Sequence, residues 1–551
     1  MSANSTQLKM APNTTTPTLS PYIGSFTYRH AAHLLKRTTF GARNADIKAF
    51  VSKGLNFSVL ELLRPDKTPS PPVRMVPTWP TGEYGDDYIK VGDTFVNENN
   101  YNYYRFLYMR VWWMKLMINQ GRGITEKMVH FLQNLVPTSW ESVQEARFVY
   151  KTHMLYRKYA LGNYKEFIKE VTVDPGMLLY LNGNYNDKNN PDENYARELQ
   201  ELFCIGKGPD SGYTQDDVIA AAKILTGWRV DWANNTNYFA AYAHSTGDKK
   251  FSAYYNNKII SGKSGDAGKE ETTELINMIF EQNEVAKHIV RKLYIYFVQS
   301  EISDSVETNI ITPLANIFRS NNYNFKPVLE KLLLSKHFFD ESVMGAIIKS
   351  PTDLLVGSIR TLGIQLIPQK RSTYNYCITD LPSEADFWNH QSIVDHCSYL
   401  GMNMMAPPNV AGWPAYHQQP LYYKCWITAD SLAWREYIMS ACKNPPGGFY
   451  HYPNIKADWM KYIASFSTPS NPAKLVQELC WQLLSKEVPE ATRISIKNEF
   501  LLYKSTNDLI WTNLWNNYLK NPSDQNIIND ITNRFSGLLG NILNSPDYHL
   551  M

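Results

Sequence analysis

Three glutamates and one arginine fall within nine consecutive residues, and they are the side chains of this sequence best suited to chemistry. Glu193, Arg197, Glu198 and Glu201 all belong to the stretch "PDENYARELQELFCIG", residues 191–206. Paired carboxylates serve as general acids and bases, or hold a metal, when a histidine or a further carboxylate reaches them from another element. On a helix, however, a spacing of four also makes a Glu-Arg-Glu ladder worth roughly 0.2–0.5 kcal/mol per pair. The sequence alone favours the ladder over the catalytic site.

Two histidines are the candidates that would complete such a catalytic site. His33 follows His30 by three residues and precedes Leu34, so it fits either a core histidine or half of a metal-ligand pair. His244 lies near a turn in "AHSTGDKKF", where a structural hydrogen bond is the alternative to catalysis. Two ligands do not make a metal site, so no metal is predicted. The common nucleotide, zinc-protease and haem signatures are absent, and no cofactor is predicted either.

Composition and charge narrow the classes of partner. The 551 residues include 55 basic and 52 acidic side chains, a balance that gives no electrostatic reason to expect nucleic acid. No run of apolar residues is long enough for a transmembrane helix. Residues 1–20 lack the apolar core of a secretory signal and predict a disordered polar tail, which favours a cytoplasmic location.

The spacing of apolar residues predicts a mainly α-helical protein: one large multi-helix globular domain with a small β-hairpin insertion and long ordered loops. Thr214 followed by Asp217 predicts a capping box at the start of one helix, and Gly227 predicts its end. The predicted helices cover residues 27–37, 101–120, 125–135, 143–160, 163–172, 192–204, 215–226, 270–281, 284–298, 307–319, 325–335 and 351–362.

The expected organisation has two folded parts. A helical core spans 21–445, with the β-hairpin at about 229–262 and a long loop region at 364–425 that is rich in turn residues. The stretch "NPPGG" at 444–448 marks a boundary, and a C-terminal helical segment over 446–551 is expected to pack on the core.

Several blocks of the sequence form a recognisable series. They are "HLLKRTTFG" (33–41), "DENYARELQELFCIG" (192–206), "YTQDDVIAAAKILTGW" (213–228), "HSTGDKKF" (244–251), "KSPTDLLVGSIRTLG" (349–363) and "PPNVAGWP" (407–414). In this order they resemble the domain-of-unknown-function 1800 family. The resemblance covers about residues 21–551 and implies a largely helical protein without a known activity. Many family members are exported, and many are encoded beside a sulfatase-like family, so the resemblance favours an exported or periplasmic location and leaves the compartment open.

Residues in these blocks are expected to bind a ligand or to lock neighbouring segments together. Arg197 in particular is expected to pair with buried carboxylates. The residues are Arg37, Arg197, Asp216, Trp228, Lys249 and Trp413.

The sequence also departs from the family pattern where the pattern has chemistry. After the E-K-M motif at 126–128 the family commonly has F-W-H-N-H-F, whereas this chain has Leu132, Gln133 and Leu135 in place of the tryptophan and both histidines. Ser245 stands where the family's H-D-x-G-x-K has aspartate, and Asp192 replaces an asparagine. Neither leucine nor glutamine acts as an imidazole base or as a usual transition-metal ligand.

These substitutions favour a degenerate site. We therefore expect a helical binding or scaffolding protein, a pseudoenzyme that belongs to a larger protein assembly or a polymer-handling system. Its partner would be another protein, or a polysaccharide or other polymer. The alternative is a hydrolase, with or without a metal, that uses Glu193, Glu198 or Glu201 with His33 or His244.

Overall fold

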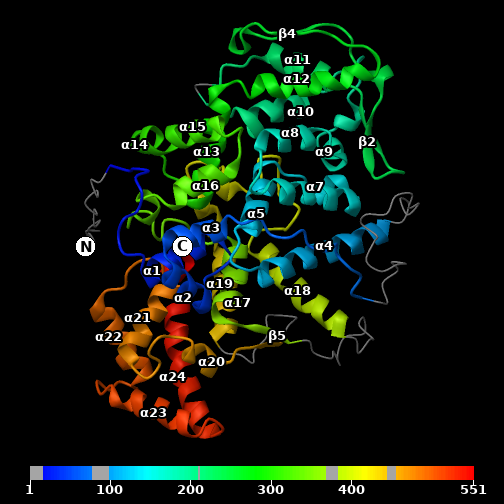
Figure 1. The fold of residues 1–551 in the computed structure, drawn as a ribbon. Helices are drawn as coiled ribbons and strands as arrows, with labels where there is room; N and C mark the ends of the chain where they lie inside the picture. Colours follow the sequence, from blue (N-terminus) through cyan, green and yellow to red (C-terminus); the bar gives the residue numbers. More distant parts are fainter. Residues whose placement is uncertain (1–15, 77–98, 209–210, 368–381, 444–453) are drawn as a thin grey trace, which may run out of the picture.

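The computed structural model describes residues 16–76, 99–208, 211–367, 382–443 and 454–551. The fold is mainly α-helical, as predicted, and within these ranges strands occur only as two-stranded antiparallel sheets. In Figure 1, α10–α12 and the first strands lie at one end, and α20–α24 lie at the other. No helix in the described ranges combines the length and the apolar character needed to cross a membrane.

The first half of the described chain contains the helices α1 to α13. They are α1 (Tyr28–Thr38), α2 (Asn44–Lys53), α3 (Leu55–Leu62), α4 (Asn99–Asn119), α5 (Thr125–Leu135), α6 (Trp140–Val143), α7 (Ala146–Tyr159), α8 (Tyr164–Thr172), α9 (Pro175–Tyr180), α10 (Glu193–Glu198), α11 (Gln215–Ile224), α12 (Lys269–Ile279) and α13 (Asn283–Phe297).

The second half contains the helices α14 to α24, of which the first is a single short turn. They are α14 (Asp304–Val306), α15 (Thr312–Ser320), α16 (Phe325–Leu333), α17 (Pro351–Leu362), α18 (Pro382–Tyr399), α19 (Ala429–Lys443), α20 (Trp459–Ala464), α21 (Pro472–Leu483), α22 (Glu490–Ile496), α23 (Leu509–Lys520) and α24 (Gln525–Leu543).

The capping box of α11 forms as the sequence predicts. The Asp217 carboxylate accepts from the Thr214 backbone N–H at 2.7 Å, and the Thr214 hydroxyl accepts from the Asp217 backbone N–H at 3.3 Å. The helix ends at Ile224, and Gly227 in the turn that follows adopts a φ of +95°, a left-handed conformation that suits glycine.

The helix predicted over 192–204 forms but changes its winding halfway. It begins with Asp192, whose side chain accepts from the Asn194 backbone N–H, and it runs as α10 before becoming a π-helical turn, η3 (Leu199–Cys204). A π-turn holds more residues than an α-turn, so Glu201 no longer stands one turn beyond Arg197. The Glu193–Arg197 pair forms at 2.8 Å, but Glu201 pairs with Lys207, so the predicted continuous ladder was wrong.

The segment at 228–260 contains two small hairpins in place of one. The strands β1 (Trp228–Asp231) and β2 (Thr236–Phe239) pair with each other, and so do β3 (Lys249–Lys250) and β4 (Ile259–Ile260). Figure 1 places them at the end of the molecule that also holds α10–α12.

The expectation of a continuous loop over 364–425 was wrong because this region contains the 18-residue helix α18. Many of its buried side chains are polar, among them His390, Gln391 and His396, so the apolar spacing that marks a helix in sequence is missing. Residues 368–381 lie outside the described ranges. The helices α2 and α3 were also missed.

The C-terminal helices share one hydrophobic core with the rest of the protein. Leu34 of α1, Leu293 of α13 and Leu538 of α24 all belong to the same buried cluster. The strand β5 (Gln365–Ile367) pairs with β6 (Asn454–Lys456), and α21 contacts α1 while α24 contacts α19. The expected boundary at 444–448 and residues 1–15 of the expected tail lie outside the described residues, whereas Leu19 is buried.

Candidate functional site

A cleft of about 1020 Å³ brings together segments that are far apart in the sequence. Its walls come from the end of α5, the π-turn η3 with the glycine turn after it, one face of α13, and the loop over 411–424. The side chains that line the cleft include charged, polar and apolar groups. Among them are Asn134, Leu135, Glu201, His288, Lys292, Tyr296 and His417.

Most charged groups of the cleft are already paired. Glu201 forms an ion pair with Lys207 across the turn after η3. Arg291 binds the Glu307 carboxylate through two nitrogens, at 2.9 and 2.7 Å, and also contacts Glu284. These pairs hold the rim in place and reduce the number of carboxylates that are free to act on a substrate.

Lys292 differs from those groups because, within the described chain, it has no hydrogen bond or ion pair. Burial lowers its pKa to about 8. His288 lies one turn earlier on the same face of α13, where its Nε2 donates to the Leu202 carbonyl at 3.0 Å. Burial, and then the charge of Lys292, lower the pKa of His288 to about 3.

His417 reaches the cleft from the opposite loop. Its Nε2 is buried and has no hydrogen-bond partner among the described residues. Burial, and then the charge of Lys292, lower the pKa of His417 below the ordinary histidine value. An uncharged imidazole and an unpaired ammonium group therefore lie close together in one wall of the cleft.

The loop over 411–424 is held against α5 by a single amide side chain. The Asn134 Oδ1 accepts from the Trp413 backbone N–H at 2.9 Å. Gly412 has a φ of +84°, and a Cβ at this position would lie 2.4 Å from that same oxygen. The Trp413 ring stacks on His130, with the ring centres 5.4 Å apart. Trp413 therefore contacts α5 through both its backbone and its ring.

The two positions where the family pattern has histidine lie on either side of this contact. Leu135 lines the cleft, so an apolar side chain occupies that wall. Gln133 is buried, and its Oε1 has no hydrogen-bond partner in the described chain. Neither position carries an imidazole in this chain, and of the two only Leu135 lines the cleft.

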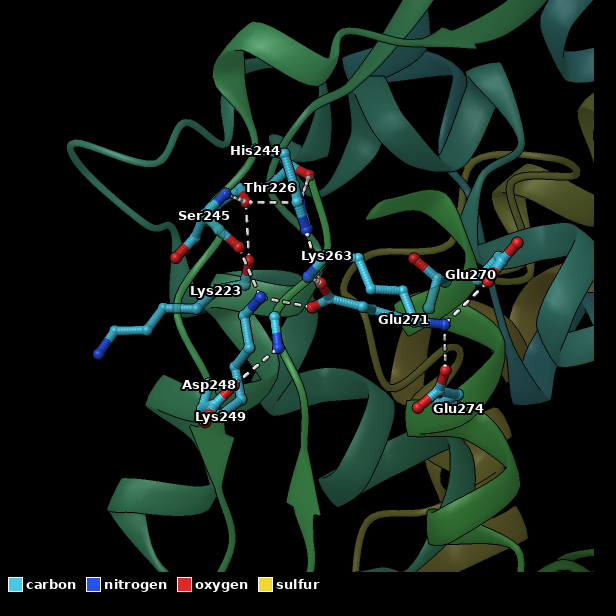
Figure 2. Close-up of polar contacts among 12 residues, drawn as sticks. Lys223, Thr226, His244, Ser245, Asp248, Lys249, Lys263, Glu270, Glu271 and Glu274 are labelled. Carbon is cyan, nitrogen blue, oxygen red and sulfur yellow. Dashed lines mark hydrogen bonds and ion pairs between the residues drawn. The ribbon is translucent and has the colours of Figure 1, made fainter. Parts of the chain in front are cut away.

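A second polar cluster, built around Glu271 of α12, contains His244 and Lys249 (Figure 2). All three side chains are buried. Lys249 forms an ion pair with Glu271, and the His244 Nε2 lies 3.2 Å from the same carboxylate. Burial raises the pKa of Glu271, but the hydrogen bonds from His244 and Lys249 outweigh it, so the pKa is lowered overall.

The backbone completes this second cluster. Glu271 also accepts from the Lys263 backbone N–H at 2.6 Å, and Lys249 donates to the Ser245 carbonyl at 2.5 Å. The His244 Nδ1 contacts the Thr226 carbonyl at 2.9 Å, so both ring nitrogens are engaged. Ser245 contributes through its backbone, so the serine that replaces the family's aspartate removes none of these contacts.

The structure separates the candidates for a Glu/His site. Glu201 lies in the cleft, whereas Glu193 lies on the surface with Arg197 and Gln215. Glu198 is partly buried, and burial, then the charge of Glu201, raise its pKa. The carboxylate that approaches His244 is Glu271, not one of the three predicted glutamates.

His33 is a core residue of α1. Its Nε2 bonds the Phe338 carbonyl at 3.0 Å, and burial lowers its pKa well below the ordinary value. The neighbouring Arg37 is buried as well and donates to the carbonyls of Val298 and Val343 at 2.7 and 2.6 Å. Both residues tie α1 to loops elsewhere in the core.

The remaining predicted locks differ in what they contact. The Trp228 indole donates to the Thr272 hydroxyl at 3.0 Å. Asp216 is exposed, and its neighbour Asp217 instead binds the Ser252 backbone and hydroxyl, each at 2.7 Å. The partner of Arg197, Glu193, is about one-third exposed, so the expectation of buried carboxylates around Arg197 was wrong.

Sequence reasoning missed Glu271, Asn134 and Lys292 as site residues. One signal was available: His288 and Lys292 are four residues apart on a predicted helix, which places them on one face. Nothing local marked Glu271, because its partners come from distant segments. Across the described ranges, no three histidine, cysteine, aspartate or glutamate side chains are grouped so that they could hold a metal ion.

The chain belongs to the family described as "Protein of unknown function (DUF1800)", whose model matches residues 33–550. Comparison with curated proteins and with solved structures gave no match.

Proposed function

We propose that this protein binds a segment of another protein in the cleft between α5, η3, α13 and the loop over 411–424. The observation that carries the proposal is the cleft itself, which at about 1020 Å³ is as large as the larger ligand sites of proteins. Its wall is held by the buried hydrogen bond from Trp413 to Asn134, and its rim by partly exposed ion pairs, which lowers the conformational cost of binding.

Binding is better supported than hydrolysis. A hydrolase of the expected kind needs a carboxylate and a histidine within hydrogen-bond reach, about 2.6–3.2 Å. Glu201, the predicted carboxylate that lies in the cleft, is paired with Lys207, and Leu135 occupies a family histidine position in the wall. The pair that His244 forms with a carboxylate is buried and already satisfied.

A polypeptide suits the cleft better than a polysaccharide. Sugar rings bind to exposed aromatic faces, but of the four tyrosines in the lining Tyr296, Tyr416 and Tyr423 are buried in the wall and Tyr422 is partly exposed. The exposed lining residues Leu421 and Lys424 offer one apolar and one charged contact at the rim, the mixture that protein interfaces use.

The experiment blocks the cleft with one side chain. Ala411 lines the cleft, and A411W places an indole there, whereas A233W places the same group on the exposed turn between β1 and β2. Wild-type protein and both variants are immobilised, and proteins and polysaccharides of the native source that they retain are identified. We expect a protein that wild type and A233W retain and A411W loses. Equal retention by all three, or loss of a polysaccharide only, would contradict the proposal.

A further inference from the structure

Lys292 is a half-buried cation of the cleft that has no ion pair or hydrogen bond within the described residues. The other cation of α13 in the lining, Arg291, is held by Glu284 and Glu307. Partial burial removes some of the water around an ammonium group, a cost that an anion or hydrogen bonds offset. A half-buried and unpaired lysine in a cleft therefore favours a ligand that brings negative charge.

The nearest side chains supply no opposite charge to Lys292. The His288 Nε2 is committed to the Leu202 carbonyl, and Gly206 follows η3 with a φ of +92°. A Cβ on Gly206 would lie 2.5 Å from the His288 Nδ1, so the glycine lets the backbone approach this ring closely. The buried His417 Nε2 on the facing loop adds an unpartnered polar atom next to Lys292.

We propose that Lys292, flanked by His288 and His417, forms a subsite of the cleft that binds an oxyanion of the bound segment. This oxyanion is a carboxylate, a sulfate or a phosphate group. This inference rests on the proposed function for the identity of the ligand as a protein segment. The oxyanion itself can be tested on the free protein, since a compact ammonium group attracts any of these anions as a point charge.

The ammonium form is available for binding at neutral pH. With a pKa of about 8, Lys292 is mostly charged at pH 7, and a bound anion raises that pKa further. The cleft lining carries other charged and titratable groups: His288, Glu284 and Arg291 on its own helix, Glu201 on η3 and Lys207 after it, Glu301, Asp304 and Glu307 after α13, and His417 and Lys424 on the facing loop. Arg291 and Glu201 have partners of their own, so Lys292 has the strongest unmet demand for an anion.

The first experiment measures how fast single lysines of the wild-type protein react with an amine-acylating reagent, by peptide mass spectrometry. Sodium acetate, sulfate and phosphate are compared with sodium chloride at equal ionic strength. We expect at least one oxyanion to slow acylation of Lys292 by about threefold or more at saturating concentration, because the bound ion both covers the amine and favours its protonated form.

Two other lysines are the controls in the same sample. Lys287 lies on α13 outside the cleft lining, and Lys424 lies on the exposed rim, so neither rate should change. Protection by acetate alone identifies a carboxylate ligand, and protection by sulfate or phosphate identifies a sulfated or phosphorylated one. No protection by any of the three, or equal protection of all three lysines, overturns the proposal.

A variant supplies the second measurement. Sulfate and phosphate also stabilise proteins without a specific site, so the oxyanion-dependent rise in melting temperature should be smaller in K292M than in wild type, and in K292R and K424M it should match wild type. A full rise in folded K292M would overturn the site. The two proposals can fail separately. The acylation and melting experiments use the protein without a partner and test only the oxyanion site. Retention of a protein by A411W would reject the proposed function and leave the oxyanion site unaffected.

Discussion

At the scale of single residues, several buried charges in this protein pair with an opposite charge from a distant segment. Lys127 pairs with Asp353, Arg157 binds Glu126 through two nitrogens at 2.9 and 2.8 Å, and Lys249 pairs with Glu271. Such pairs contribute modestly to net stability, but the loss of one partner leaves a charge buried without compensation. They therefore specify which segments meet.

The Glu271 cluster gives the residue-scale prediction. E271Q leaves Lys249 buried without an opposite charge and should lower the free energy of unfolding by about 3–5 kcal/mol, measured by denaturant titration.

Glu270, the preceding residue, is the matched control for that substitution. It pairs with Lys263 on the surface at 2.8 Å (Figure 2), and E270Q should leave stability nearly unchanged because exposed pairs contribute little. A similar loss in both variants would show that the buried pair has no special role.

At the scale of elements, two local departures from regular geometry shape the cleft. The π-turn η3 moves Glu201 away from Arg197 and toward the cleft, where it meets Lys207. The left-handed Gly412 lets the loop over 411–424 close against Asn134. Both features belong to short segments, but their effect is on how α5, α13 and the loop face one another.

The element-scale prediction concerns that loop. G412A forces a Cβ into the Asn134 side chain and backbone, at 2.4 and 2.5 Å, and must push the loop off α5. We expect an unfolding free energy about 2–4 kcal/mol lower than that of wild type, since left-handed strain of roughly 1–2 kcal/mol adds to the clash. Denaturant titration measures the change.

Gly401 provides the control for that backbone strain. It has a similar φ of +91°, but it has open space around it, since a Cβ at this position would have no other atom within 4 Å. G401A should show only the left-handed cost, about 1–2 kcal/mol. If the two variants lose equal stability, the contact between Gly412 and Asn134 does not hold the loop.

At the scale of the whole molecule, one core unites helices from both ends of the chain and encloses several neutral histidines. His33, His130 and His153 are each about 1% exposed. Burial lowers all three pKa values, in the case of His130 to about 3. Each histidine therefore binds a proton more readily in the unfolded chain than in the folded protein.

The sign of the pH dependence follows from this difference. Above the unfolded pKa of about 6.5 these histidines do not change stability with pH; below it, the unfolded chain takes up protons and stability falls. At pH 5 each fully buried histidine should cost about 2 kcal/mol relative to pH 7. Asp174, whose pKa burial raises to about 6, opposes this by about 1 kcal/mol.

Denaturant titrations between pH 7 and 5 measure the effect. We expect the free energy of unfolding to fall over this range and the fall to be smaller in H130N, which removes one of the buried imidazoles. An unchanged slope in H130N would show that His130 is protonated in the folded protein.

The sequence by itself determined the features that depend on neighbours along the chain. Periodicity, capping and motif spacing act within a few residues of the chain. The sequence therefore predicted the helices at 125–135 and 351–362, the capping box at Thr214 and Asp217, and the family blocks. Where burial is polar, as in α18, that local signal fails.

Only the tertiary structure decided which side chains form a site. Glu271 became the partner of His244 and Lys249, and Lys292 came to face His417, through contacts between segments at least 22 residues apart in the chain. Such contacts depend on how the helices pack and on which charges the packing leaves unpaired. Neither the packing nor the unpaired charges can be predicted from a local sequence pattern. For the same reason the glutamates at 193–201, the most suggestive charges in the sequence, were divided between the surface and the cleft.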